Sequence, residues 1–156
     1  MKRKTFLKTS LAAGASFTIL PSGLWGQSKK NSTMQLAQIG TGRMGQGDMM
    51  NALNTGWKNG KMARMVAVCD VDRGRAEDAK KKVIKTYQEK GEAGVEVQLE
   101  TDFRKILSRE DIDGIVCSTP ENWHALIGVA AANAGKHIYL QKPLTYSVPE
   151  GKELVK

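Results

Sequence analysis

Acidic residues are absent from the first 33 positions of this 156-residue chain, although these positions carry six Lys or Arg. The formal net charge of +8 at pH 7 therefore arises mostly there, because the other positions hold 18 basic and 16 acidic residues. Aromatic residues make up only 6% of the chain, so no stacking platform for bases accompanies the positive charge. We therefore expect no nucleic acid among the partners of this protein.

Cysteine occurs only twice, at Cys69 and Cys117, and each residue ends an apolar run. In the strand order expected below, one strand lies between the two residues, which separates them by roughly 9 to 10 Å at about 4.8 Å per strand. A disulfide needs Cα atoms within roughly 7 Å of each other. We therefore predict two free, buried thiols. A nucleophilic role is not expected, because no base lies beside either cysteine in the sequence.

The N-terminal segment has the layout of an export signal. The charged residues lie in 1–8, and an uncharged stretch over 9–28 follows that is interrupted by Pro21. The segment resembles a twin-arginine signal in which Lys4 replaces the second arginine. The general secretory route and an uncleaved membrane anchor are the alternatives, although Pro, Gly and polar residues disfavour a membrane span. We expect residues 1–33 to be signal and linker, and the protein to be exported to the periplasm.

A glycine-rich turn follows the first apolar run after this leader. Residues 36–39 are followed by Gly40, Gly42 and Gly45 at G-x-G-x-x-G spacing, and a helix-compatible segment begins at Arg43. Gly40 would make the turn, Gly42 would let a pyrophosphate approach the backbone, and Gly45 would let the helix pack closely. The phosphates would lie at the helix N-terminus, where free amides and the helix dipole favour an anion.

An acidic residue ends the next apolar run. Residues 65–69 lead into Asp70, 25 positions after Gly45. This offset is close to the roughly 20 residues expected before the carboxylate that binds an adenosine ribose. The order of strand, glycines, helix and acid favours a dinucleotide site. The alternative is an ordinary strand-to-helix turn followed by a chance acid.

Beyond the leader, strand-like and helix-like segments alternate five times. The expected strands are 36–39, 65–69, 95–99, 112–117 and 137–140. The expected helices are 43–56, 73–91, 102–107, 122–134 and a last one from about residue 148. This alternation predicts an α/β fold of the Rossmann type over residues 34–156. Its doubly wound parallel sheet would have the strand order 3-2-1-4-5, right-handed crossovers and helices on both faces.

Two later motifs, CSTPENWH at 117–124 and GKHIYLQKPLT at 135–145, make the chain resemble a known family. It is the glucose-fructose oxidoreductase, inositol dehydrogenase and rhizopine-catabolism (Gfo/Idh/MocA) family, and the resemblance covers residues 34–156. Its members join an N-terminal dinucleotide-binding domain to a C-terminal, mostly antiparallel sheet domain. They oxidise or reduce a hydroxyl of sugars, inositols and related compounds. We expect this chain to fold around a nucleotide but not to turn over substrate by itself, because the second domain is absent.

The resemblance also assigns the cofactor-binding residues. The phosphate turn corresponds to Gly40, Thr41, Gly42, Arg43, Met44 and Gly45. Asp70 corresponds to the ribose acid, which would repel a 2′-phosphate and so favour NAD over NADP. Thr119, Pro120 and His124 match the loop that lies under the nicotinamide end in the family.

Gln141 and Lys142 match the family's Glu-Lys-Pro motif, whose lysine contacts the cofactor ribose and the substrate hydroxyl. Lys142 is the expected catalytic residue, since a cation there would stabilise negative charge on the reacting oxygen. Gln141 keeps the hydrogen-bonding shape of the usual glutamate but loses its charge, which would hold and tune Lys142. No metal site is expected.

These assignments imply an NAD(P)-dependent oxidoreductase that acts on CH–OH groups of a sugar, inositol or related polyol. The full-length protein is expected to form a homo-oligomer and to meet the membrane only through its N-terminal signal. Two alternatives stay open. One is an NAD-dependent glycosidase of the same family, which oxidises its sugar transiently. The other is a non-catalytic nucleotide-binding module.

Overall fold

The computed structural model describes residues 33–156, so the expected export signal lies outside the described residues. Within them, five strands form one parallel sheet in the order β3-β2-β1-β4-β5. The strands are β1 (Met34–Ile39), β2 (Ala63–Cys69), β3 (Gln98–Glu100), β4 (Gly114–Cys117) and β5 (His137–Leu140). This is the sheet and the strand order that the sequence predicts.

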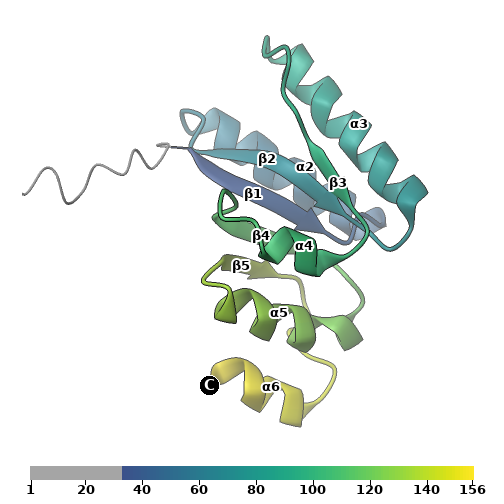
Figure 1. Cartoon of the computed structure of the whole chain (residues 1–156), viewed down its shortest axis with the longest axis vertical. Helices are drawn as coiled ribbons and strands as arrows, with labels where there is room; N and C mark the ends of the chain where they lie inside the picture. Colours follow the sequence, from purple (N-terminus) through teal and green to yellow (C-terminus); the bar gives the residue numbers. More distant parts are fainter. Residues whose placement is uncertain (1–32) are drawn as a thin grey trace, which may run out of the picture. The chain divides into compact units, whose positions relative to one another are not determined.

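Helices cover both faces of this sheet, as Figure 1 shows. They are α2 (Arg43–Lys58), α3 (Arg73–Glu89), α4 (Phe103–Leu107), α5 (His124–Asn133) and α6 (Val148–Val155), with a short 3-10 helix η2 (Glu121–Trp123) before α5. α2 and α3 pack on one face, and α4 and α5 pack on the other. The expected doubly wound α/β architecture is therefore confirmed. No helix within residues 33–156 has both the length and the apolar character needed to cross a bilayer.

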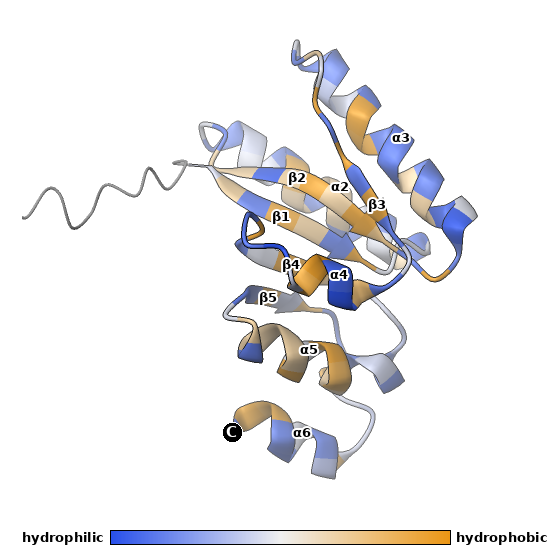
Figure 2. Cartoon of the chain, viewed as in Figure 1, coloured by the Kyte–Doolittle hydropathy of each residue, from blue (hydrophilic) through white to orange (hydrophobic). Residues whose placement is uncertain are grey.

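Two apolar layers hold the helices to the sheet. On one face, Ile39 and Cys69 pack with Phe103 of α4 and Ile127 of α5. On the opposite face, a second set of buried side chains joins α2 and α3 to the strands; it includes Met49, Leu53, Met65, Val83 and Tyr87. In Figure 2, apolar residues follow β2, and α3 carries both hydrophilic and apolar residues along its length. Burial on both faces is what a parallel sheet requires.

Most elements begin or end one to three residues from their expected bounds, and two of these differences have a physical reason in the packing. α2 continues to Lys58, whereas Gly56 was expected to end it. Gly56 lies inside the helix because a Cβ there would come within 2.7 Å of the Ala63 Cβ, so this glycine permits close packing on β2. β3 covers only Gln98–Glu100, because the alternating residues before it face the α3 layer without pairing with β2.

The carboxyl ends of four strands are aligned at one edge of the sheet. Ile39 is in register with Cys69 of β2 and with Cys117 of β4, and Cys117 is in register with Leu140 of β5. The residues that follow these strands therefore begin side by side. Ligands of open parallel sheets bind at this edge, where the strand order reverses.

Cys69 and Cys117 are free and buried, and β1 separates them, as predicted. Burial, aided by the negative charge of Asp70, raises the pKa of the Cys69 thiol to about 12. Burial also raises the pKa of Cys117. Both side chains are therefore neutral core residues near pH 7.

Candidate functional site at the carboxyl edge of the sheet

The glycine turn after β1 is a tight junction between β1, α2 and the segment after β4. Gly40 has φ +83°, and a Cβ there would lie 2.7 Å from the Ser118 carbonyl oxygen. A Cβ on Gly45 would lie 2.0 Å from the Gly40 carbonyl oxygen. Neither position has room for a side chain, so Gly40 makes the turn and Gly45 permits close packing, as their spacing predicts.

Gly42 differs from the other two glycines, because a Cβ there would meet no atom within 4 Å. Gly42 is also the N-cap of α2, and its helix has neither a side-chain cap nor an acidic residue in the first turn. Arg43 and Met44 open the helix and are exposed. The first amides of an α-helix have no acceptor within the helix, and they carry its positive dipole end. An anionic group therefore fits in the open space at Gly42.

Thr41, next to Gly42 in the sequence, holds Asp70 through hydrogen bonds. Its backbone N–H and its hydroxyl both donate to Asp70 Oδ2, at 2.7 and 3.0 Å, and the residue is fully buried. Asp70 Oδ1 accepts a hydrogen bond from the Asp72 N–H at 3.0 Å. The carboxylate is thus held at the end of β2, beside the glycine turn. Thr41 therefore orients Asp70, and its backbone N–H donates to this carboxylate and not to a ligand.

The segment after β4 is attached to the segment after β5 through His124. This side chain is 1% exposed, and its Nδ1 and Nε2 lie 2.6 and 2.8 Å from the carbonyl oxygens of Pro143 and Thr119. Carbonyl oxygens only accept, so a neutral ring can donate to one of them and a doubly protonated ring to both. His124 therefore connects the two loops and has no ring nitrogen left for a ligand. Pro120 is exposed between them.

Lys142 follows β5 and is exposed. Its backbone N–H donates to the Gln141 side-chain Oε1 at 2.8 Å, and the Lys142–Pro143 peptide bond is cis. Among the described residues, its ammonium group takes part in no ion pair. The lysine thus presents an uncompensated positive charge at the same sheet edge as the glycine turn.

Asp48, a residue that the sequence analysis did not single out, joins these parts of the site. Its Oδ2 accepts hydrogen bonds from the Ser118 hydroxyl and from Gln141 Nε2, both at 2.8 Å. Gln38, fully buried in β1, donates to Ser118 Oγ at 3.2 Å and to the Gly40 carbonyl at 2.8 Å. No spacing rule points to Asp48, because its partners lie 70 and 93 positions away in the sequence.

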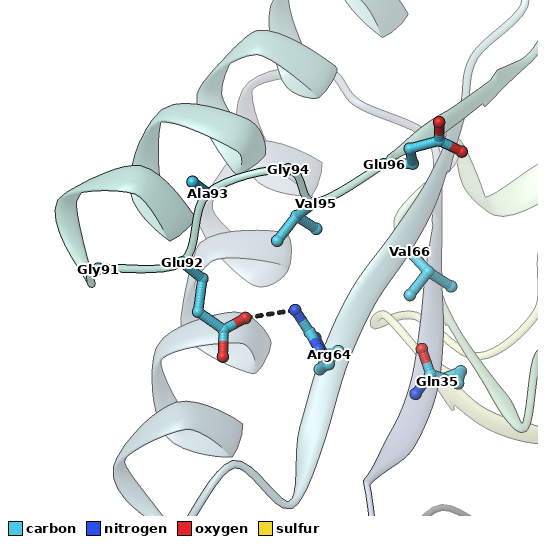
Figure 3. Close-up of a pocket in the computed structure, with 9 residues that line it drawn as sticks. All are labelled: Gln35, Arg64, Val66, Gly91, Glu92, Ala93, Gly94, Val95 and Glu96. Carbon is cyan, nitrogen blue, oxygen red and sulfur yellow. Dashed lines mark hydrogen bonds and ion pairs between the residues drawn. The ribbon is translucent and has the colours of Figure 1, made fainter.

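A separate hollow of about 570 Å³ lies at the amino ends of the strands, remote from this site (Figure 3). Gln35 and Arg64 line it, together with the loop that precedes β3. Glu92, an acidic residue that lines the hollow, forms ion pairs with Lys61 at 2.8 Å and with Arg64. The hydrogen bond from Lys61 and the positive charge of both side chains hold the pKa of Glu92 below its usual range. The charge of Glu92 is therefore compensated, and the second acidic residue of this hollow, Glu96, is exposed to solvent. Within residues 33–156, no group of three or more His, Cys, Asp or Glu side chains could hold a metal ion.

Comparison with known proteins identifies the family of this chain. The family model described as "Oxidoreductase family, NAD-binding Rossmann fold" matches residues 34–156. The chain therefore belongs to the Gfo/Idh/MocA oxidoreductase family, as its motifs indicate. The Rossmann domain of this family binds NAD.

Solved structures of dehydrogenases share the fold. The myo-inositol dehydrogenase of Lactobacillus casei, solved in complex with NAD(H) and myo-inositol, superposes with a TM-score of 0.65 at 24% identity. The myo-inositol 2-dehydrogenase of Lactobacillus plantarum superposes with a TM-score of 0.65 at 27% identity. Each match covers 79% of this chain and 32% of the other protein.

Relatives found by sequence are named as glycosidases. A glycosyl hydrolase family 109 protein of Shewanella sp. (strain ANA-3) is 32% identical over 89 residues. An alpha-N-acetylgalactosaminidase of Shewanella oneidensis is 29% identical over 89 residues. Each match covers 57% of this chain and 19% of the relative, so the chain spans about a fifth of the length of these proteins.

Proposed function

We propose that this chain binds NAD along the carboxyl edge of its sheet, as part of an oxidoreductase. The reaction would be hydride transfer between the nicotinamide and a hydroxyl carbon of a sugar, an inositol or a related polyol. The observation that carries the proposal is the open space at Gly42, beside an uncapped helix N-terminus and an oriented Asp70. Bound NAD supplies the hydride chemistry, and the protein supplies position and charge.

Each part of the edge has a distinct task in this proposal. The amides of Arg43 and Met44 would receive the diphosphate, and Asp70 would accept hydrogen bonds from the adenosine ribose. The negative charge of Asp70 would repel a 2′-phosphate, which favours NAD over NADP. Lys142 would bind the reacting oxygen and stabilise negative charge as it develops. Thr119 and Pro120 would line the nicotinamide end of the cofactor.

The inositol dehydrogenases among the structural neighbours support a polyol or sugar substrate. The curated glycosyl hydrolase family 109 relatives favour a second candidate, an NAD-dependent glycosidase in which transient oxidation of the sugar permits elimination. Sugar-dependent release of NADH by the full-length protein would identify the dehydrogenase. Hydrolysis of an aryl glycoside without net NADH release would identify the glycosidase. A protein that binds NAD but does neither would be a nucleotide-binding module.

Export to the periplasm is a further part of the proposal. The basic start and the weakly apolar stretch of residues 1–33 support it, and the twin-arginine route suits a protein that must fold around its cofactor before export. We also propose that the full-length protein is a homo-oligomer. Cell fractionation tests the first statement, with retention in the cytoplasm as the contrary result. Sedimentation of the full-length protein tests the second, and a monomer would refute it.

Calorimetric titration of the chain with NAD and NADP tests the cofactor assignment. Asp70→Asn keeps an acceptor for the Thr41 donors but removes the charge and the acceptor of the Asp72 N–H. It should weaken NAD binding about 10-fold, because a hydrogen bond to a charged group contributes about 1.5 kcal/mol or more. It should also narrow the preference for NAD over NADP. Asp78→Asn, an exposed acid on α3, is the control and should leave both affinities unchanged. Unchanged NAD affinity in Asp70→Asn would refute the ribose role.

A further inference from the structure

A directed series of hydrogen bonds runs from the glycine turn to Lys142. Gln38 donates to Ser118, and the Ser118 hydroxyl donates to Asp48 Oδ2. From the other side, the Lys142 N–H donates to Gln141 Oε1, and Gln141 Nε2 donates to the same Asp48 oxygen. Both branches therefore end on one acceptor. Asp48 lies on α2, so it connects the helix that begins at the phosphate site to the segment that carries the lysine.

The charge of Asp48 also explains why residue 141 is an amide. Gln141 both donates and accepts here, since it gives a hydrogen bond to Asp48 and receives one from Lys142. A glutamate at position 141 could still accept from the Lys142 N–H. Its second oxygen, however, would meet Asp48 Oδ2 at hydrogen-bond distance with no proton between them. Two carboxylates in such contact cannot both be ionised without a large penalty.

We propose that Asp48 is the positioning residue for Lys142, and that the Asp48–Gln141 pair takes the place of a glutamate before the lysine. The negative charge has moved from the strand end to the helix, and the Gln141 amide transmits its position to the Lys142 backbone. This inference rests on the proposed function, because it assigns to Lys142 a place beside the bound NAD. It adds a residue to the site that no spacing in the sequence indicates.

Exchange of the two functional groups tests this pairing. The variants are Gln141→Glu, Asp48→Asn and the double variant Asp48→Asn/Gln141→Glu, in which the amide and the carboxylate trade places. Asp78→Asn is the control, since it removes an equal charge from an exposed site on α3. NADH binding to the full chain is measured by fluorescence titration between pH 5.5 and 8.5. Two other ionisable groups lie near the pair: His137 lines the same hollow as Asp48, and Lys142 follows Gln141. Both are present in every variant, so they do not account for a difference in pH dependence between variants.

Gln141→Glu should bind NADH about 10-fold more weakly than wild type at pH 8.5, with the loss shrinking towards pH 5.5 as one carboxyl takes up a proton. The double variant should regain wild-type affinity to within about 3-fold and lose that pH dependence, because the like-charge contact is gone. A Gln141→Glu variant with the wild-type affinity and pH profile would overturn the proposal. So would a loss that the second substitution does not repair.

Two measurements without nucleotide separate this inference from the cofactor assignment. In urea unfolding, the two single variants and the double variant should show coupling. The unfolding equilibrium constant of the double variant should be at least about 5-fold smaller than the combined effects of the single variants predict. By NMR, Asp48→Ala should speed hydrogen exchange of the Lys142 amide about 10-fold more than that of the β5 amides. Wild-type chain that fails to bind NADH but shows both effects would refute the proposed function alone. Additive effects with uniform exchange would refute the role of Asp48.

Discussion

The two halves of the candidate site are built differently. The glycine half consists of the ends of β1 and β2 with the start of α2, where Ala67 and Val68 are completely buried. The lysine half consists of β5, the residues that follow it, and the segment after β4 as far as His124; in it, Tyr139 is 57% and Leu144 60% exposed. A hollow of about 400 Å³ remains open along β5 beside Asp48. Close backbone packing at Gly40 and Gly45 distinguishes the first half, whereas side-chain hydrogen bonds to Asp48 and His124 position the loops of the second.

This difference indicates how each half can fail. A change in the glycine half must disturb close backbone packing, because its atoms have no space to move. A change in the lysine half removes a hydrogen bond and leaves most of the core intact. Nucleotide binding and the position of Lys142 should therefore be separable by mutation. The following variants test that expectation, from the largest effect to the smallest.

Gly45→Ala should have the largest effect, because its Cβ would lie 2.0 Å from the Gly40 carbonyl oxygen. We expect a loss of about 3 kcal/mol in the free energy of unfolding together with loss of NAD binding, as in severe overpacking. Gly47→Ala is the matched control on the same helix, because a Cβ there meets nothing within 4 Å. It should stabilise the chain by about 0.5 to 1 kcal/mol through helix propensity. Urea unfolding measures both, and equal stability of the two variants would contradict the packing argument.

His124→Ala should have an intermediate effect that is confined to the lysine half. Loss of the ring leaves the carbonyls of Thr119 and Pro143 without a partner, at a cost of about 2 kcal/mol in the free energy of unfolding. Hydrogen exchange should increase in the 142–146 segment and stay unchanged around Gly40. His137→Ala is the control, because the exposed His137 side chain should change stability by less than about 0.5 kcal/mol. Increased exchange at the glycine turn as well would show that the halves are not separable.

Thiol reactivity should give the smallest response. Because burial raises the pKa of Cys69 to about 12, its thiol is almost entirely protonated at pH 8. We expect no reaction of the folded chain with a disulfide reagent at this pH, and reaction of both thiols in urea. The rate should rise with pH, because the thiolate is the reactive form. Rapid labelling of Cys69 in the folded chain would mean that the glycine half opens more readily than its packing implies.

Much of the glycine half could be predicted from local sequence. Gly40, Gly42 and Gly45 specify a strand, a turn and a helix start within a few residues, and the regular alternation of segments specifies the sheet. The prediction for the end of α2 is wrong, because Gly56 resembles a helix stop but lies inside the helix, where it permits close contact with Ala63. The prediction for the start of β3 is also wrong, since alternating burial before Gln98 does not require hydrogen-bonded pairing with β2.

The roles of Thr41 and His124 could not be read in the same way. The sequence places both in loops at the sheet edge and the resemblance assigns them to the cofactor. In the structure, their polar atoms are used by Asp70, Thr119 and Pro143. These bonds depend on how close two loops come after folding. They make Thr41 and His124 supports of the site.

The sequence by itself determined the strand order, the position of the glycine turn and the family, because each depends on residue types at short, regular spacing. Only the tertiary structure decided which side chains meet across that edge. Asp48 reaches Ser118 and Gln141, 70 and 93 positions away, because three carboxyl-edge segments converge beside α2. Such a contact has no local pattern. Its geometry follows from the packing of the whole sheet.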